Sequence, residues 1–219
     1  MTKHFQNEID GLKKKILHLT ALVEQNLESA VRAVDERDLK LAVKVIATDD
    51  AIDQAEVELE EECLKILALY QPVATDLRFI IAVLKINSDI ERIGDLAVNI
   101  AQRAKSLAES KNKNIPFDLS GMVRLTLSMV KKSTDSLVKL DSQLARQVGA
   151  MDDKVDEMHR GAYRAVESEI IKDPQSVEYY INLLGVSRYL ERIADHSTNI
   201  AEDVVYLVEG QIVRHQHAI

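Results

Sequence analysis

The sequence predicts an all-α protein: a tandem repeat of two three-helix bundles, with six helices related by a pseudo-twofold axis. Three observations lead to this fold class. The 219 residues include only 7 Gly, 3 Pro and no Trp, and such a composition favours helices. Apolar residues recur at the spacing of an amphipathic helix. The segment 91–101, ERIGDLAVNIA, also returns as 191–201, ERIADHSTNIA, which indicates an internal duplication.

The first repeat (residues 1–110) is predicted to contain three antiparallel helices. An apolar stripe that starts at Ile9 predicts the first helix, and a second stripe that starts at Ile86 predicts the third. Pro72 separates the second helix from the third, and Thr75 is the expected N-cap of the third. The expected helices are 4–36, 38–69 and 75–109.

The second repeat (residues 117–212) is predicted to follow the same plan. The polar stretch 109–118 is the expected linker between the repeats. Asp118 is expected to cap the first helix of this half. Asp173 is expected to cap the last, where Pro174 takes the first helical position. The expected helices are 119–141, 144–172 and 175–209.

Composition and charge exclude several classes of function. The net charge of -8 argues against a general nucleic-acid surface, which needs a basic stripe. Cys63 is the only cysteine, so the chain has no intramolecular disulfide and no thiolate metal cage. The sequence has no signal-peptide pattern and no apolar window of membrane length. It also has no phosphate loop or nucleophile motif. We expect a cytoplasmic, non-enzymatic protein that binds no nucleic acid and meets a membrane only indirectly or peripherally.

Acidic residues recur at four-residue spacing on two helices of each half. The segment 48–53, TDDAID, resembles 151–156, MDDKVD, so the second helix of each half carries the same pair as its copy. Because each helical residue turns by ~100°, residues four apart stay on one stripe, and these stripes point away from the bundle's own core. The candidate metal ligands are Asp49, Asp53, Glu91, Asp95, Asn99, Asp152, Asp156, Glu191, Asp195 and Asn199.

Four carboxylates brought together repel one another strongly unless cations neutralise them. Ligands that are all carboxylate or amide oxygens suit hard cations. The expected cofactors are therefore divalent or trivalent metal ions (iron, Mg, Mn or Zn). A multinuclear cluster fits the same ligands, since one carboxylate bridges two ions.

Two other classes remain open from the residues alone. A di-iron carboxylate oxidase of the ferritin-like type uses Glu-x-x-His twice, facing the inside of one four-helix bundle. The nearest approach here is 156–159, DEMH, which occurs once, and the acids face outward. A single acidic pair is ordinary solvated helix surface, so a metal-free structural helical protein is the third class. The repetition of the pairs in both halves favours metal sites.

Three segments carry a resemblance to a known family. The segment 71–78, QPVATDLR, followed by ERIGD at 91–95 and ERIADH at 191–196, resembles the PhoU family over nearly the whole chain. The resemblance implies two three-helix bundles, a cytoplasmic homodimer and multinuclear metal clusters. In this chain, the family's metal motifs correspond to Asp49/Asp53 with Glu91/Asp95 and to Asp152/Asp156 with Glu191/Asp195. Asn99 and Asn199 are additions from the stripe geometry.

The resemblance also implies a regulatory role. Members of the family restrain the phosphate-starvation (Pho) response and limit phosphate uptake. They couple the phosphate ABC transporter, chiefly its ATPase, to a phosphate-sensing histidine kinase. The second half departs from the family's first motif, because Asp173-Pro174 stands where the first half has Gln71-Pro72. The two metal sites or partner surfaces are therefore not expected to be equivalent in every respect.

Overall fold

The computed structural model describes residues 3–111 and 114–211. Within these ranges the chain forms six long helices and no strand. They are α1 (Lys3–Asp35), α2 (Leu39–Tyr70), α3 (Ala74–Glu109), α4 (Leu119–Lys139), α5 (Ser142–Lys172) and α6 (Val177–Glu209), and a short 3-10 turn (Pro174–Ser176) precedes α6. Each helix end lies within two residues of the position predicted from the sequence. The all-α prediction is confirmed.

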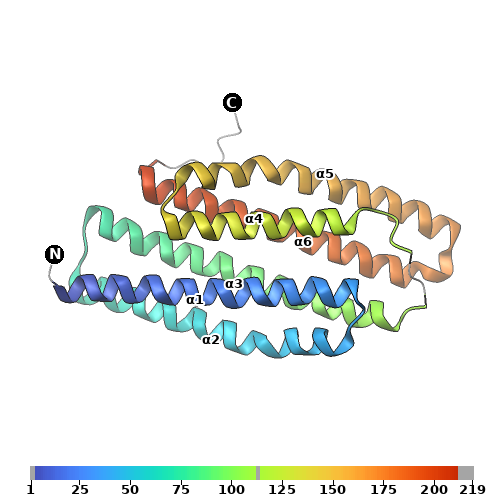
Figure 1. Ribbon diagram of the computed structural model, residues 1–219, viewed down its shortest axis with the longest axis horizontal. Helices are drawn as coiled ribbons and strands as arrows, with labels where there is room; N and C mark the ends of the chain where they lie inside the picture. Colours follow the sequence, from blue (N-terminus) through green and yellow to red (C-terminus); the bar gives the residue numbers. More distant parts are fainter. Residues whose placement is uncertain (1–2, 112–113, 212–219) are drawn as a thin grey trace.

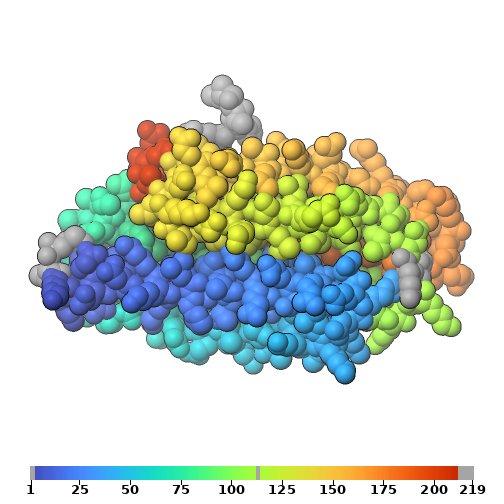
Figure 2. Space-filling view, viewed as in Figure 1, coloured from blue at the N-terminus to red at the C-terminus, as the bar shows by residue number. Residues whose placement is uncertain are grey.

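The helices lie in two stacked halves, α1–α3 and α4–α6, with their axes along the length of the molecule (Figure 1). α4 runs in the opposite direction to α1, and α6 in the opposite direction to α3, as a pseudo-twofold axis requires (Figure 1). α3 and α6 form the most extensive helix pair and join the halves. α1 and α4 also meet, side by side, along the face shown in Figure 2.

The predicted apolar stripes form the core. In α1 the stripe runs from Ile9 to Val23, and both residues are buried. The stripe of α3 is buried from Ile86 to Ile100, and that of α6 is buried in the same register, one hundred residues later. Burial of apolar area contributes ~25 cal/mol per Å², so these stripes hold the two halves together as one continuous core. No helix in the described part of the chain combines the length and the apolar character needed to cross a membrane.

Three aspartates cap the helices with their side chains. Asp118 Oδ1 accepts a 2.8 Å hydrogen bond from the Gly121 amide, as predicted. Asp38 and Asp141 cap α2 and α5, each by accepting two backbone hydrogen bonds at 2.8–3.0 Å. These two caps were not foreseen, although they stand at equivalent positions of the repeat. Capping of this kind contributes about 1 kcal/mol per helix.

Two of the predicted caps are wrong in detail. α3 begins one residue earlier than expected, and its N-cap is Val73, which makes no side-chain capping bond, so Thr75 lies inside the helix. Asp173 precedes the 3-10 turn rather than α6 itself, and its Oδ2 accepts a 2.6 Å hydrogen bond from the Ser176 hydroxyl. The reason is local: Pro174 starts a tight turn before the α-helical hydrogen bonds begin.

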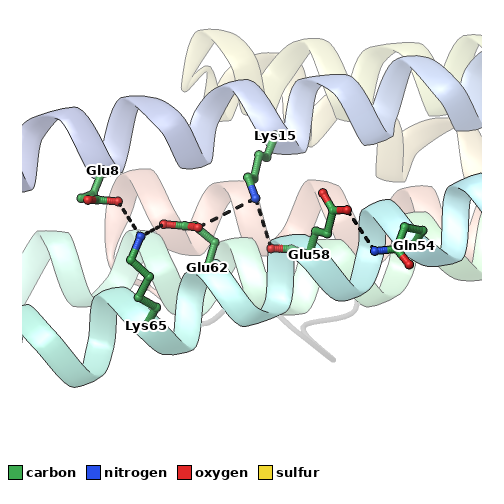
Figure 3. A network of polar contacts seen from close by, with 6 residues as sticks. All are labelled: Glu8, Lys15, Gln54, Glu58, Glu62 and Lys65. Atoms are coloured by element: carbon green, nitrogen blue, oxygen red, sulfur yellow. Dashed lines mark hydrogen bonds and ion pairs between the residues drawn. The ribbon is translucent and has the colours of Figure 1, made fainter.

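A polar network joins α1 to α2 on the surface (Figure 3). Lys65 Nζ lies 3.2 Å from Glu8 Oε2 and 2.7 Å from Glu62 Oε1. Lys15 Nζ lies 3.8 Å from Glu62 and donates to the backbone carbonyl of Glu58 at 3.5 Å. Exposed ion pairs contribute at most about 1 kcal/mol each. The network therefore aligns the two helices, while the apolar stripes supply most of the stabilisation.

Candidate metal centres

We call the pairs of acids on each helix the acidic rows: Asp49 and Asp53 on α2 and Glu91 and Asp95 on α3, and their copies on α5 and α6. In the first half, the two helices that carry the rows are in direct contact. α2 carries Asp53 next to Ile52, and α3 carries Asp95 next to Gly94. A Cβ atom at Gly94 would lie 3.2 Å from Ile52 Cγ2, so the missing side chain lets the two backbones approach closely. This close crossing brings the row that contains Asp53 alongside the row that contains Asp95.

The pKa values of the first-half acids show that the rows interact. Burial raises the pKa of Asp49, and the negative charges of Asp53 and Asp95 raise it further. Burial likewise raises the pKa of Glu91, followed by the charge of Asp95 and, more weakly, that of Asp53. Acids from α2 and α3 therefore share one field, in which the charges of Asp53 and Asp95 disfavour the ionisation of Asp49 and Glu91.

The second half repeats this arrangement with a stronger effect. Burial together with Asp195 and Asp156 raises the pKa of Asp152 to about 6. Burial raises the pKa of Glu191, and Asp195 and Asp156 add to the shift. Asp195 is exposed at the rim of the row, yet the surrounding protein and the charge of Asp156 still raise its pKa. The four predicted carboxylates of this half are thus close enough to interact electrostatically.

Several buried side-chain atoms have no hydrogen-bond partner within the described residues, and one aspartate oxygen among them occurs at equivalent places in the two halves. These equivalent atoms are Asp49 Oδ1 and Asp152 Oδ1. The Thr198 hydroxyl lies near the Asp152 carboxyl group and favours its ionised form, but not within the geometry of a hydrogen bond to Oδ1. A buried carboxylate oxygen without a partner costs free energy, typically about 1–3 kcal/mol or more. The same orphaned atom at the same place in both copies is what a cation ligand would leave when no cation is bound.

The carboxylates do not yet converge on one point. Within residues 3–111 and 114–211, no three side chains of His, Cys, Asp or Glu form a ligand set for a single ion. Binding of one ion by both rows would therefore require their side chains to move.

The two asparagines differ in their surroundings. Asn199 Nδ2 donates a 3.2 Å hydrogen bond to Asp89 Oδ1 of α3, across the boundary between the halves. His196 Nδ1 lies 2.8 Å from the same oxygen, so this histidine joins the halves. Asn99 is half-buried on α3. Metal ligation by Asn99 and Asn199 stays a prediction.

The sequence-based search missed one residue at the end of the first-half row. Glu56 stands seven residues after Asp49, and burial together with Glu60 and Asp53 raises its pKa. Asn87 Nδ2 donates to Glu56 Oε1 at 3.1 Å. The seven-residue spacing is a signal for this position. A comparison of the two halves does not reveal this position, because only the first half has a carboxylate there.

The equivalent position in the second half is His159. His159 Nδ1 lies 2.7 Å from the hydroxyl oxygen of Ser187, and Ser187 is the copy of Asn87. Burial lowers the pKa of His159. The two acidic rows therefore end differently, with a carboxylate in one half and an imidazole in the other.

The paired arginines of the repeat also behave differently. Arg92 Nη1 lies 3.1 Å from Asp95 Oδ2, as expected for charges one turn apart. Its Nε lies 3.5 Å from Oε2 of the adjacent Glu91. Arg192, its copy, forms no ion pair within 4.0 Å among the described residues. Arg192 instead lines a groove beside α5.

Comparisons with known proteins agree on one family. The model of the PhoU domain matches twice, at residues 16–104 and 119–204. The phosphate-specific transport system accessory protein PhoU homolog of Aquifex aeolicus is 40% identical over 210 residues, which cover 96% of this chain and 95% of that protein. The crystal structure of PhoU from Pseudomonas aeruginosa superposes with a TM-score of 0.92 at 36% identity, covering 94% of this chain and 100% of the other.

A second solved structure gives the same result. The phosphate transport system regulatory protein PhoU from Streptococcus pneumoniae superposes with a TM-score of 0.85 at 30% identity. The match covers 95% of this chain and 99% of that chain. The two family-model matches coincide with the two halves of the structure and confirm the predicted resemblance.

Proposed function

The chain belongs to the PhoU family, and from this premise we propose that it is a non-enzymatic regulator of phosphate transport. Its relatives are named as accessory or regulatory proteins of the phosphate transport system, and the family is a regulatory rather than an enzymatic one. The family model matches both halves of the chain, at residues 16–104 and 119–204.

The first finer part of the proposal is that each half binds metal ions through its acidic rows. The observation that carries it is that Asp49 Oδ1 and its copy, Asp152 Oδ1, are both buried without a hydrogen-bond partner. Neighbouring carboxylates raise the pKa of both aspartates. When bound, the ions would neutralise the rows and link α2 to α3 and α5 to α6. Carboxylate oxygens suit Mg²⁺, Mn²⁺ and iron in particular.

The second finer part is that the protein acts as an adaptor in the cytoplasm. It couples the ATPase of the phosphate ABC transporter to a phosphate-sensing histidine kinase, restrains the phosphate-starvation response when phosphate is plentiful, and works as a homodimer. Support comes from family membership and from the names of the relatives.

Elemental analysis of protein purified without chelator tests the metal part. We expect bound metal in the wild type and a clear loss in Asp95→Ala combined with Asp195→Ala, with helical content unchanged, because both side chains lie at the helix surface. Asp50→Ala combined with Asp153→Ala is the matched control, since these exposed acids directly follow Asp49 and Asp152. Equal metal content in both double variants, or none in the wild type, would reject the metal centres and favour a metal-free structural bundle.

Co-purification from a phosphate-replete lysate tests the adaptor part. We expect the tagged protein to recover the transporter ATPase or the sensor kinase, and the metal-site double variant to recover less of it. Failure to recover either partner with the wild-type protein would contradict the adaptor role. That result would not bear on metal binding, which the elemental analysis measures independently.

A further inference from the structure

A groove near the junction of the two halves carries positive charge in an otherwise acidic protein. It has a volume of about 570 Å³ and is lined by residues of α5 and α6 together with Arg103 of α3. The lining residues that carry the argument are Arg103, His159, Tyr163, Arg188, Tyr189 and Arg192. The chain as a whole has a net charge of -8, so three arginines in one groove are a marked local departure.

The arginines of the groove are not neutralised by ion pairs. Among the described residues, Arg103, Arg188 and Arg192 form no salt bridge within 4.0 Å. Glu191 of the neighbouring acidic row interacts electrostatically with Arg188 and Arg192, but at a longer range than an ion pair. The guanidinium groups therefore keep hydrogen-bond donors for an incoming anion.

Arg103 is held in place by neutral partners. Its Nη1 donates to Asn182 Oδ1 at 3.1 Å and its Nη2 to the Tyr189 hydroxyl at 3.4 Å. A Cβ atom at Gly185 would lie 3.2 Å from Arg103 Nε, so the glycine leaves the space that the side chain occupies. A half-buried, oriented guanidinium with no carboxylate beside it is suited to bind an anion with little loss of side-chain entropy.

The internal repeat provides a direct comparison, because the equivalent place in the first half has the opposite charge. The groove positions on α5 correspond to positions 103 residues earlier on α2. Those on α6 correspond to positions 100 residues earlier on α3, and Arg103 of α3 corresponds to the position 100 residues later on α6. There, Glu56 and Glu60 replace His159 and Tyr163, Ser88 and Asp89 replace Arg188 and Tyr189, and Asp203 replaces Arg103. Arg92 stands in place of Arg192, and Lys85 in place of Gly185, so the equivalent surface is acidic on balance. The acidic rows are kept in both copies, whereas this surface has changed sign. The groove is therefore not a by-product of the shared fold.

The size and lining of the groove indicate the class of ligand. Arginine guanidinium groups bind phosphate oxygens in a bidentate manner. The exposed ring of Tyr163, 57% accessible, offers a face for an aromatic base. The ring of Tyr189 lies 6.0 Å from the Arg103 guanidinium carbon and helps to hold that arginine. Pockets for small organic ligands range from roughly 300 to 1,000 Å³, and this groove falls within that range. We propose that the groove binds a nucleotide, with its phosphates on the arginines and its base against Tyr163.

Isothermal titration calorimetry of the full chain with ADP, in the presence of EDTA, tests this proposal. EDTA prevents any metal ion on the acidic rows from holding the phosphates. We expect saturable ADP binding that Arg188→Gln weakens by about tenfold or more, as for loss of a charged hydrogen bond. Arg188→Lys should retain part of the affinity. Arg92→Gln, at the position equivalent to Arg192 in the first half, is the matched control and should bind like the wild type.

The aromatic part of the site is tested separately with inorganic phosphate. We expect Tyr163→Ala to weaken ADP binding, and inorganic phosphate to bind more weakly than ADP. Phosphate that binds as tightly as ADP would overturn the nucleotide assignment and identify the free anion as the ligand. No saturable ADP binding at millimolar concentration, or equal weakening by Arg188→Gln and Arg92→Gln, would reject the groove as the site. Arg188 is exposed, so its variants are expected to keep the wild-type melting temperature.

Discussion

Replacing Asp152 by asparagine should stabilise the metal-free protein while weakening the metal site. Asp152 has the same shape as asparagine, but its pKa rises from the ordinary 3.8 to about 6 because of burial and the charges of Asp195 and Asp156. When folding raises the pKa of a carboxyl group, the ionised form of that group destabilises the folded state and the protonated form does not. This destabilisation of the folded state is absent below pH 3.8, grows as the pH rises, and reaches its full size above about pH 6.

The size of the effect follows from this shift in pKa. A change of one pKa unit corresponds to about 1.4 kcal/mol, so the full shift at Asp152 amounts to about 3 kcal/mol. Solvent screening of a partly exposed carboxyl reduces this to about 1–2 kcal/mol. For a protein of this length, 1 kcal/mol changes the melting temperature by about 2–4 °C. We therefore expect Asp152→Asn to melt about 2–8 °C higher than the wild type at neutral pH.

Thermal unfolding followed by circular dichroism, with EDTA present, measures this difference. The gain should disappear below pH 3.8, where the wild-type carboxyl is protonated, and should be smaller in Asp153→Asn, which alters the exposed neighbour. Added Mn²⁺ should then stabilise the wild type more than the variant, because a ligand that binds only the folded state raises its stability. A variant that melts at or below the wild-type temperature at neutral pH, or a gain that persists in acid, would refute the electrostatic reasoning.

Two further substitutions test the packing that positions the acidic rows. Gly94→Val should lower the free energy of unfolding by about 1–3 kcal/mol, because the added side chain meets Ile52 Cγ2 between α3 and α2. Gly94→Ala should change it by less than about 1 kcal/mol, since helix propensity offsets the tight contact. Urea denaturation distinguishes the two, and equal losses would contradict this account. Asp89→Ala should cost about 1–3 kcal/mol, because His196 and Asn199 lose their shared acceptor. An unchanged urea midpoint would show that these bonds do not hold the halves together.

Most of the fold was predictable because the signals for helices are local. The stripe from Ile9 to Val23 became a buried face, and the ends of all six helices were close to their predicted positions. The errors at Thr75 and Asp173 also have a local origin. Several short polar residues near a proline are possible N-caps, and which of them caps the helix depends on the backbone conformation of the turn.

The acidic rows were predictable for a different reason. Four-residue spacing places Glu91 and Asp95 on one helix face whatever the rest of the fold, and the repetition in the second half distinguished them from ordinary surface acids. Glu56 escaped notice because the repeat has His159 in its place. The comparison of copies finds what they share and misses positions where they have diverged.

The sequence by itself determined the six helices, their duplication and the faces on which the acids lie, since each of these depends on residues within a few turns of one helix. Only the tertiary structure decided that rows on neighbouring helices interact, that one oxygen of Asp49 and one of Asp152 are left without a partner, and that Arg103 joins Arg188 and Arg192 in one groove. These outcomes depend on burial and on charges from helices far apart in the chain, and electrostatic interactions follow distance in space rather than spacing in sequence.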